Sequence, residues 1–316
     1  MHSPFHPRLG RILLVASCIL IALLVLLGSM HTFLRFGFVP RRGRQIFAVV
    51  IENHEDARPY QRGLDTALFI GEFLVEGYIS RFIALFDREN LPAQIGPIRS
   101  LRPYFLSVVD PWTSALLYAG GSPEALDLLK EEGSLPWVNL LGIDDAPLRD
   151  ESVPPPHNMF LRPAFISALF AGRHLRSVIW PPFPVGNGPA AGSGATNISL
   201  QFFSALHNAR YRYDAIDDAY IRTTGSVTHA ARPKNILILA IPILGEGERG
   251  RLDIRPEGSG PALLFRSGTV QEGRWERGVG RKDPFRFMDQ EGKSLPFAQG
   301  LIWMTVLPTL DRVRWE

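Results

Sequence analysis

The hydrophobic pattern separates an apolar N-terminal segment from a longer part in which apolar and polar positions alternate. Ile12 to Leu27 is an unbroken run of apolar and small residues, and Gly28 to Met30 adds no charge. As a helix with 1.5 Å rise per residue, Ile12 to Met30 extends about 28 Å, close to the thickness of the hydrocarbon layer of a bilayer. The pattern therefore predicts one transmembrane helix rather than a buried core helix.

Three fates are open to this N-terminal segment. A cleaved signal peptide needs small residues at its cleavage site, and no good site follows a short apolar core here. Val15 to Cys18 is similar to a lipobox, which would place a lipid on Cys18. However, only a few apolar residues precede Cys18, whereas a lipoprotein signal has most of them before the cysteine. We therefore favour an uncleaved signal anchor.

The charges beside the apolar segment leave its orientation ambiguous. Arg8 and Arg11 precede it and suit a cytoplasmic N-terminus. Arginines also follow it, and by the positive-inside rule they favour a cytoplasmic location for the C-terminal side. They are Arg35, Arg41, Arg42 and Arg44.

Short buried runs alternate with helical patterns between residues 46 and 185. Apolar runs without alternation predict strands covered on both faces, and capping residues mark helix starts. Such alternation is typical of a partly parallel sheet with helices against it. The predicted elements are strands Ile46–Ile51, Ile79–Phe86 and Ser114–Tyr118, a helix Thr66–Glu76 between Asp65 and Gly77, a helix from Ser100 to about Val109, and a helix after Ser122 with Pro123 at its first position.

The sequence pattern changes after the Pro/Gly-rich stretch Pro181 to Gly194, because short strand patterns and turn signals dominate beyond it. This change predicts the start of a second domain. We therefore predict an α+β fold in three parts. An anchor and Arg-rich stalk occupy 1–45, a layered α/β domain with a partly parallel sheet occupies 46–185, and a mostly antiparallel β domain occupies 195–316. The predicted strands of the last part are Ile198–Phe203, Ala209–Tyr213, Ala219–Thr223, Ile236–Ile241, Ala262–Phe265 and Leu301–Leu307.

Composition excludes several classes of function. A formal net charge of +3, with no basic run interleaved with aromatics, argues against nucleic acid as a partner. Cys18 is the only cysteine and lies in the apolar segment, so the globular part has no disulfide, thiolate metal site or cysteine nucleophile. No motif indicates a cofactor.

Two glutamates four residues apart are the first candidates for chemistry. On the predicted helix, Glu72 and Glu76 project from one face, close to apolar side chains. Such surroundings raise the pKa of a carboxyl group, and two carboxyls with separated pKa values suit acid–base hydrolysis. Arg81 stands in an otherwise apolar strand, so a structural ion pair with Glu72 or Glu76 is the alternative interpretation.

Two arginines at a predicted helix start are the second candidates. Arg99 and Arg102 flank Ser100, and free helix N–H groups beside guanidinium groups favour an anion. The segment Gly120 to Ser122 precedes another helix N-terminus. If both ends converge, they would hold a carboxylate or phosphate; if not, ordinary capping and surface charge explain them.

The histidines predict no metal site. His157 follows three prolines in a stiff loop, where it would act as a base or a ligand. The spacing of the histidines at 54, 157, 207 and 229 does not match a metal-binding pattern.

These segments together resemble the YerB-like lipoprotein family, a pair of domains of unknown function. The likeness covers about residues 46–310, in order. The matching stretches are Phe47–Asn53, Arg58-Pro59, Glu72-x-x-x-Glu76-Gly77, Arg81-Phe82, Ile95–Tyr104, Ala119–Pro123, Pro156–Asn158, Tyr211-x-Tyr213-Asp214, Tyr220-x-Arg222, Gly258-x-Gly260 and Gly300–Pro308.

The resemblance implies a bacterial protein at the outer face of the cytoplasmic membrane, with an α+β fold of layered sheets, and it supplies no reaction. Two departures from the family pattern stand out. Family members commonly carry a lipid-modified cysteine, whereas the anchor here is predicted to be a helix. A histidine often stands where this chain has Tyr118, so an activity that needed this histidine would be in doubt here.

The resulting hypothesis is a membrane-anchored, extracytoplasmic protein that binds an anionic cell-envelope ligand, either a glycan or a peptide. The alternatives are a cell-wall glycan hydrolase or transglycosylase that uses Glu72 and Glu76, and a scaffold for a membrane partner. The sequence does not decide whether the protein is an enzyme. The residues expected to line the ligand site are Glu52, Asn53, Arg58, Arg81, Arg99, Ser100, Arg102, Gly120, Gly121, Ser122, His157 and Asn158.

Overall fold

The computed structural model groups Arg41–Glu316 into one compact unit. The predicted membrane segment Ile12–Met30 lies outside the described residues apart from Leu20. Within the described part of the chain, no helix has both the length and the hydropathy needed to cross a bilayer. The described residues are 20, 42–131, 135–143, 148–186, 188–190 and 192–316.

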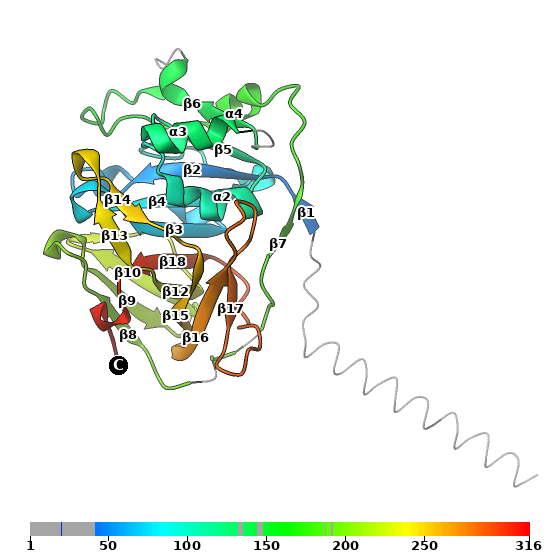
Figure 1. Cartoon of the computed structure of the whole chain (residues 1–316), viewed down its shortest axis with the longest axis vertical. Coiled ribbons are helices and arrows are strands. Elements are labelled where there is room, and N and C mark those ends of the chain that lie inside the picture. The colour runs from blue at the N-terminus through cyan, green and yellow to red at the C-terminus, as the bar shows by residue number, and fades with distance from the viewer. Residues whose placement is uncertain (1–19, 21–41, 132–134, 144–147, 187, 191) are drawn as a thin grey trace, which may run out of the picture. The chain divides into compact units, whose positions relative to one another are not determined.

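A mixed sheet of ten strands runs through this unit (Figure 1). Its order across the sheet is β17 (Arg286–Met288), β16 (Thr269–Arg277), β15 (Gly258–Arg266), β12 (Asn235–Ala240), β18 (Ile302–Leu307), β3 (Phe69–Leu74), β4 (Ser80–Asp87), β2 (Ile46–Glu52), β5 (Ala115–Tyr118) and β6 (Trp137–Asn139). The late strand β18 lies between β3 and β12 and is parallel to both. Strands from the two halves of the chain therefore share one sheet.

Three strands of the first half bring their carboxyl ends to the same edge. β2 pairs in parallel with β5, and β5 pairs in parallel with β6. β4 is antiparallel to both β2 and β3. In sheets with parallel strands, loops beyond the carboxyl ends are common places for ligands. Residues that follow Glu52, Tyr118 and Asn139 therefore lie at an edge suited to a site.

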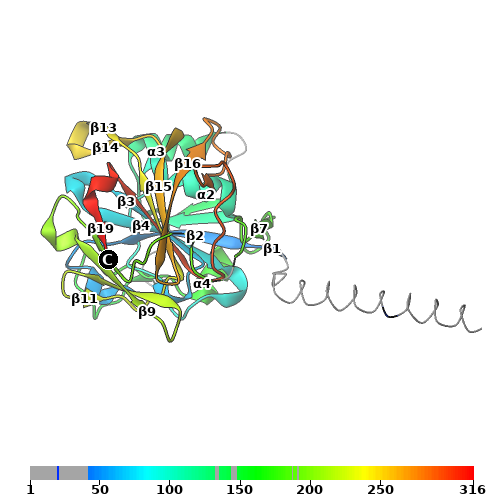
Figure 2. The same ribbon diagram turned by 90° about the horizontal axis from the view of Figure 1, so that it is seen from below.

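A second sheet and the helices α2 (Leu106–Trp112) and α3 (Pro123–Lys130) cover opposite faces of the main sheet (Figure 2). Tyr211, from the second sheet, meets Trp303 of β18 edge to face. On the other face, Trp112 packs its ring against Phe69. The second sheet has the order β11 (Val227–Thr228), β10 (Ala219–Thr224), β9 (Ala209–Asp214), β8 (Asn197–Leu200) and β19 (Val313–Trp315).

The remaining elements are short. The helices are α2 (Leu106–Trp112), α3 (Pro123–Lys130) and α4 (Pro163–Leu169), and two small antiparallel pairs join β1 (Arg42–Arg44) to β7 (Val178–Trp180) and β13 (Ile243–Glu246) to β14 (Leu252–Ile254). The described part of the chain is thus an α+β fold with a partly parallel sheet, as predicted. The predicted boundary Pro181–Gly194 lies in the connection between β7 and β8, and the division into two domains there stays a prediction.

The predicted helix Thr66–Glu76 is wrong, because Phe69–Leu74 forms strand β3. Every residue of β3 is buried, since sheet layers cover both faces, so the strand lacks the alternation that would reveal it. Its aromatic and β-branched side chains favour an extended strand. Glu76 lies beyond the strand in a short 3₁₀ turn, so Glu72 and Glu76 do not share a helix face.

The second predicted helix begins later than expected. A 3₁₀ turn at Pro103–Phe105 leads into α2, and Ser100 does not cap it. The third predicted helix is confirmed: Ser122 is the N-cap of α3, and Pro123 is its first residue.

Candidate functional site

The segment Ile98–Leu101 connects the carboxyl ends of β2 and β5. Arg99 N–H donates to Val50 O at 3.0 Å, and Ala119 N–H donates to Arg99 O at 3.0 Å. Leu101 in turn bridges in parallel to Gly121. This segment is therefore held in an extended conformation between the ends of two strands. It brings most of the predicted ligand-site residues to one edge of the sheet.

Glu76, Arg81 and Arg102 form one charged group at this edge. Arg102 Nη2 donates to Glu76 Oε2 at 2.7 Å, and Arg102 Nε contacts the other carboxylate oxygen. Arg81 Nη1 donates to Ser100 O at 2.9 Å, while Arg81 Nη2 lies 4.0 Å from Glu76. The sequence analysis gave a structural ion pair of Arg81 with Glu72 or Glu76 as the alternative to a catalytic role. In the structure Arg81 is near Glu76, at 4.0 Å, and does not pair with Glu72.

The charges in this group shift two pKa values. Burial, and next the charge of Arg102, lower the pKa of Arg81 to about 10, while Glu76 acts in the opposite direction and Arg99 adds to the lowering. Burial acts to raise the pKa of Glu76, but hydrogen bonds and charge from Arg102 outweigh it, so this pKa is lowered. The Glu76 side chain is therefore an ionised carboxylate at neutral pH.

Glu52 organises a second charged group beside the first. Its Oε1 lies 2.8 Å from Arg99 Nε, and its Oε2 lies 2.9 Å from His157 Nδ1. The Glu52 side chain is buried, whereas 29% of the Arg99 side chain is exposed. Asn158, also predicted for the site, instead accepts a hydrogen bond from Arg149 at 3.0 Å. Arg99 is thus a partly exposed guanidinium positioned by a buried carboxylate.

The helix N-terminus at Ser122 already has acceptors from the protein itself. Ala125 N–H donates to Ser122 Oγ at 3.3 Å. The pKa of Glu124 is lowered by its own backbone amide and by Ser122. Gly120 has a positive φ of 70° and donates its N–H to Asn139 Oδ1 at 2.9 Å. Protein side chains therefore accept hydrogen bonds at this helix N-terminus, where the sequence analysis expected an anionic ligand to bind.

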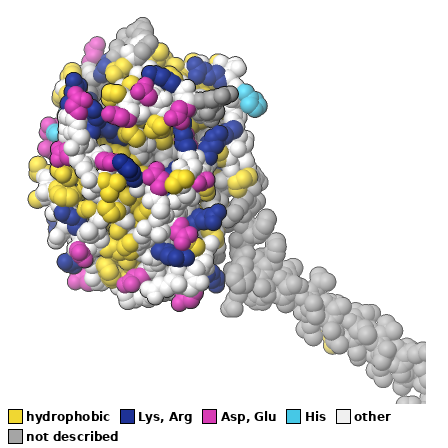
Figure 3. Space-filling view, in the orientation of Figure 1, with side chains coloured by type: hydrophobic (Ala, Val, Ile, Leu, Met, Phe, Trp, Pro, Cys, Tyr) yellow, Lys and Arg dark blue, Asp and Glu magenta, His cyan; other side chains and the backbone are white. Residues whose placement is uncertain are grey.

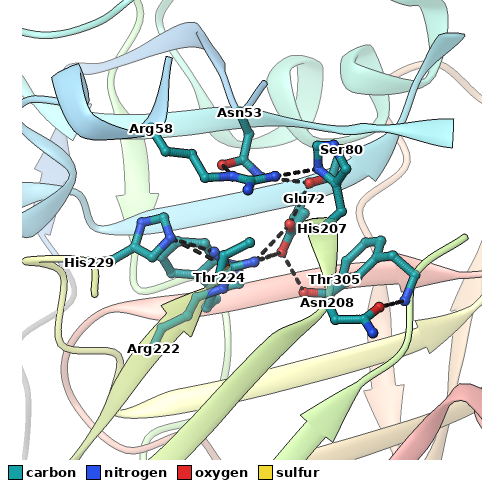
Figure 4. Close-up of polar contacts among 12 residues, drawn as sticks. Asn53, Arg58, Glu72, Ser80, His207, Asn208, Arg222, Thr224, His229 and Thr305 are labelled. Carbon is teal, nitrogen blue, oxygen red and sulfur yellow. Dashed lines mark hydrogen bonds and ion pairs between the residues drawn. The ribbon is translucent and has the colours of Figure 1, made fainter. Parts of the chain in front are cut away.

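Glu72 belongs to a different, fully buried network (Figure 4). Arg222 Nη2, from β10, donates to Glu72 Oε1 and Oε2 at 2.9 and 3.0 Å, and neither side chain is exposed. Ser80 Oγ, Trp303 Nε1 and Thr305 Oγ1 also donate to this carboxylate. All donors come from the protein interior, so Glu72 has no contact with solvent in this arrangement.

Arg58 and Asn53 extend this buried network toward the edge. Asn53 Nδ2 donates to Ser80 Oγ at 2.7 Å, and Arg58 Nε donates to Asn53 Oδ1 at 3.3 Å. Arg58 Nη2 lies 2.6 Å from Nδ1 of His207. Burial, followed by the charge of Arg58, lowers the pKa of His207 to about 4. Arg58 and Asn53 were predicted to line the ligand site. In the structure they lie in a buried network that links the two halves of the chain.

Sequence reasoning missed the partners of Glu72 from the second half of the chain. Arg222 stands 150 residues from Glu72 in sequence. A signal for it exists: Arg222 occupies a buried position in the alternating strand β10. A charged residue at such a position requires a buried counter-charge.

Among the described residues, His54, Asp56 and His157 lie close enough to share a metal ion. Their candidate ligand atoms are all within 4.8 Å of one another. The sequence spacing predicts no such group, because the chain fold brings His157 to the β2 loop from a distant segment.

The molecular face seen in Figure 3 carries interspersed basic and acidic side chains. This distribution agrees with the small net charge.

Comparisons with known proteins agree on one relationship. The model of the family described as "protein of unknown function (DUF3048) N-terminal domain" matches residues 39–176, and its C-terminal counterpart matches residues 198–304. The chain is 31% identical over 280 residues to "Putative lipoprotein YerB" of Bacillus subtilis (strain 168), covering 85% of this chain and 82% of that protein. The crystal structure of YerB from Bacillus subtilis superposes with a TM-score of 0.75 at 28% identity, covering 87% of this chain and 94% of the other.

Proposed function

The chain belongs to the DUF3048 family, and we propose that it binds an anionic ligand at the edge formed by Glu52, Glu76 and the segment Arg99–Arg102. One observation carries the proposal: three guanidinium groups gather there around two carboxylates. Arg81, Arg99 and Arg102 contribute three positive charges, and Glu52 and Glu76 contribute two negative ones. Burial is the largest cause of the lowered pKa of Arg81, and repulsion from Arg102 and Arg99 adds to it. An anion placed there relieves this repulsion.

Arg99 is the group that would contact the ligand. Its side chain is the most exposed of the three guanidiniums. A guanidinium binds a carboxylate or phosphate through paired hydrogen bonds, and Glu52 uses the Nε of Arg99. A ligand carboxylate or phosphate therefore suits the remaining donors, as in an acidic glycan or peptide of the cell envelope.

The proposed location is the outer side of a membrane. The uncharged segment Ile12–Met30 is long enough for an anchor, and the Bacillus subtilis relative carries the name of a lipoprotein. A globular part beside the envelope would have access to envelope polymers.

The hydrolase alternative has less support. A general acid needs a carboxyl group whose pKa is raised toward the working pH. Glu76 has a lowered pKa, and Glu72 is enclosed by donors from the protein.

The test is ligand binding by the full chain in detergent micelles, measured by titration calorimetry. The probes are a muramyl peptide with free carboxylates, a glycerol-phosphate oligomer, and the amidated muramyl peptide as the neutral comparison. We expect binding of a charged probe, at least tenfold weaker for Arg99→Ala and unchanged for Arg212→Ala on the exposed side of β9. Equal binding of charged and neutral probes, or no effect of Arg99→Ala, would contradict the proposal.

A further inference from the structure

The loop after β2 and the loop that carries His157 meet at a cluster of metal-ligand side chains. His54 and Asp56 lie in one turn, and backbone hydrogen bonds from Ala57 and Arg58 to His54 O, at 3.0 and 3.1 Å, hold it. The rings of His54 and His157 lie nearly parallel, with centroids 5.8 Å apart. Two imidazoles and a carboxylate are thus fixed on backbone that is ordered by its own contacts.

The geometry points to a binding site for one Zn²⁺ ion, with His54, Asp56 and His157 as its protein ligands. Two ligand atoms bound to one tetrahedral zinc ion at about 2.0–2.1 Å are about 3.4 Å apart. His54 Nδ1 and Asp56 Oδ2 are separated by 3.6 Å. All three ligand atoms lie within 4.8 Å of one another, so small rotations of the exposed Asp56 and the partly exposed His54 side chains would close the set around an ion at His157.

One ring nitrogen of His157 contacts a carboxylate, as the ring nitrogen turned away from the metal usually does in metal-binding histidines. Its Nδ1 is 2.9 Å from Glu52 Oε2, which leaves Nε2 for the metal. A carboxylate in this position fixes the ring orientation and increases the basicity of the ligating nitrogen. Arg99 holds the same carboxylate in place at 2.8 Å.

The proposed ligand atom of His54, Nδ1, has one competing hydrogen bond, while Nε2 lies 3.6 Å from Glu55 Oε2. The Asp56 N–H lies 3.3 Å from His54 Nδ1, so metal binding at Nδ1 replaces a long hydrogen bond from an exposed loop amide. This replacement costs little, because water can hydrogen-bond the released N–H group.

The ligand types decide the class of ion. Two imidazole nitrogens with one carboxylate favour Zn²⁺ over Mg²⁺ or Ca²⁺, which prefer oxygen ligands. The Asp56 side chain is 72% exposed and that of His54 is 34% exposed. The remaining coordination position therefore faces solvent and holds water, as in open zinc sites. The inference does not depend on the proposed anion binding.

The test is zinc titration of the full chain in detergent micelles, after removal of metal with a chelator, in competition with a chromophoric chelator. We expect one Zn²⁺ per chain. His54→Ala, Asp56→Asn and His157→Ala should each weaken binding at least tenfold, while His174→Ala, at an exposed histidine elsewhere, should not. Mg²⁺ at the same concentration should not compete.

X-ray absorption at the zinc edge gives an independent measure and should show two imidazole ligands. Asp56→Asn keeps the test decisive if the His157 variant misfolds, because Asp56 is exposed. The inference is overturned if Asp56→Asn and His54→Ala bind zinc like the unchanged chain, if His174→Ala weakens binding equally, or if the spectrum shows no imidazole.

Discussion

Glu72 of β3 and Arg222 of β10 form an ion pair between the main sheet and the second sheet, with 2.9 Å between Oε1 and Nη2 and neither side chain exposed. The guanidinium of Arg222 also lies 4.4 Å from the ring centroid of Trp303, and its Nε donates to the Tyr211 hydroxyl at 3.0 Å. The charges are therefore enclosed by hydrogen bonds and aromatic rings. We expect such a pair to fix the packing of the two sheets more than it adds net stability.

Glu72→Gln should lower the free energy of unfolding by about 3–5 kcal/mol, because Arg222 then stays buried without a counter-charge. Chemical denaturation of the purified protein measures the loss. Asp127→Asn is the control, since the Asp127–Lys130 pair is exposed, with about 70% of each side chain accessible, and should lose less than about 1 kcal/mol.

The double variant Glu72→Leu with Arg222→Met separates pairing from packing. It should be less destabilised than the sum of its two single variants, because no buried charge remains. Additive losses would show that the two side chains act independently, contrary to the ion-pair account.

The sequence predicted the strands of the main sheet better than the role of its polar residues. Ile46–Ile51 and Ile79–Phe86 stand out as apolar runs, and both are strands. The sequence of β3 resembles a helix because Asp65 and Gly77 are residue types that cap helices, and burial on both sides removes the alternation of a strand.

Partners that are distant in sequence limited the prediction of the site. The motifs around Arg99 and Gly120 are local, so their approach could be anticipated from strands that end at one edge. The pairing of Glu72 with Arg222, and the meeting of His54 with His157, depend on how distant segments pack together. The sequence indicates that Arg222 needs a buried counter-charge, but it does not identify Glu72 as the partner.

Ser122→Ala should cost about 1 kcal/mol of stability without changing the affinity for an anion. The hydroxyl accepts a hydrogen bond from Ala125 N–H at 3.3 Å, and the loss of an N-cap costs this much on average. Ser122→Asp should restore most of the stability. Thermal unfolding and calorimetric titration are the two measurements; weaker anion binding with unchanged stability would assign Ser122 to the ligand instead.

Acidification should destabilise the fold through His207. Its pKa is about 4 in the folded protein, against an ordinary value of 6.5. Between these values the unfolded chain takes up a proton that the folded chain does not, so stability falls as the pH falls from 6.5 toward 4. Burial and Arg222 also lower the pKa of His229, in the same direction.

In His207→Gln, the unfolded chain should take up about one proton fewer than in the unchanged protein between pH 6.5 and 4, because glutamine does not titrate in this range. The slope of unfolding free energy against pH, measured near pH 5, should become less steep, while the exposed His174→Gln control should keep the original slope. An unchanged slope in His207→Gln would mean that His207 is protonated in the folded protein.

Glu76→Gln should strengthen anion binding, because it removes the carboxylate that competes with the ligand for Arg102. Arg102 Nη2 now donates to Glu76 at 2.7 Å, and loss of this charge raises the surplus at the edge from one positive charge to two. A change of one charge near a surface is worth about 1 kcal/mol, or about fivefold in affinity. Calorimetric titration with the charged muramyl peptide measures it, with Glu257→Gln, whose carboxylate lies 3.7 Å from Arg277 Nη1, as the control. Weaker binding in Glu76→Gln would instead mean that the carboxylate orients Arg102 for the ligand. If the unchanged chain cleaves a glycan and Glu76→Gln does not, the alternative function of a glycan hydrolase would be favoured.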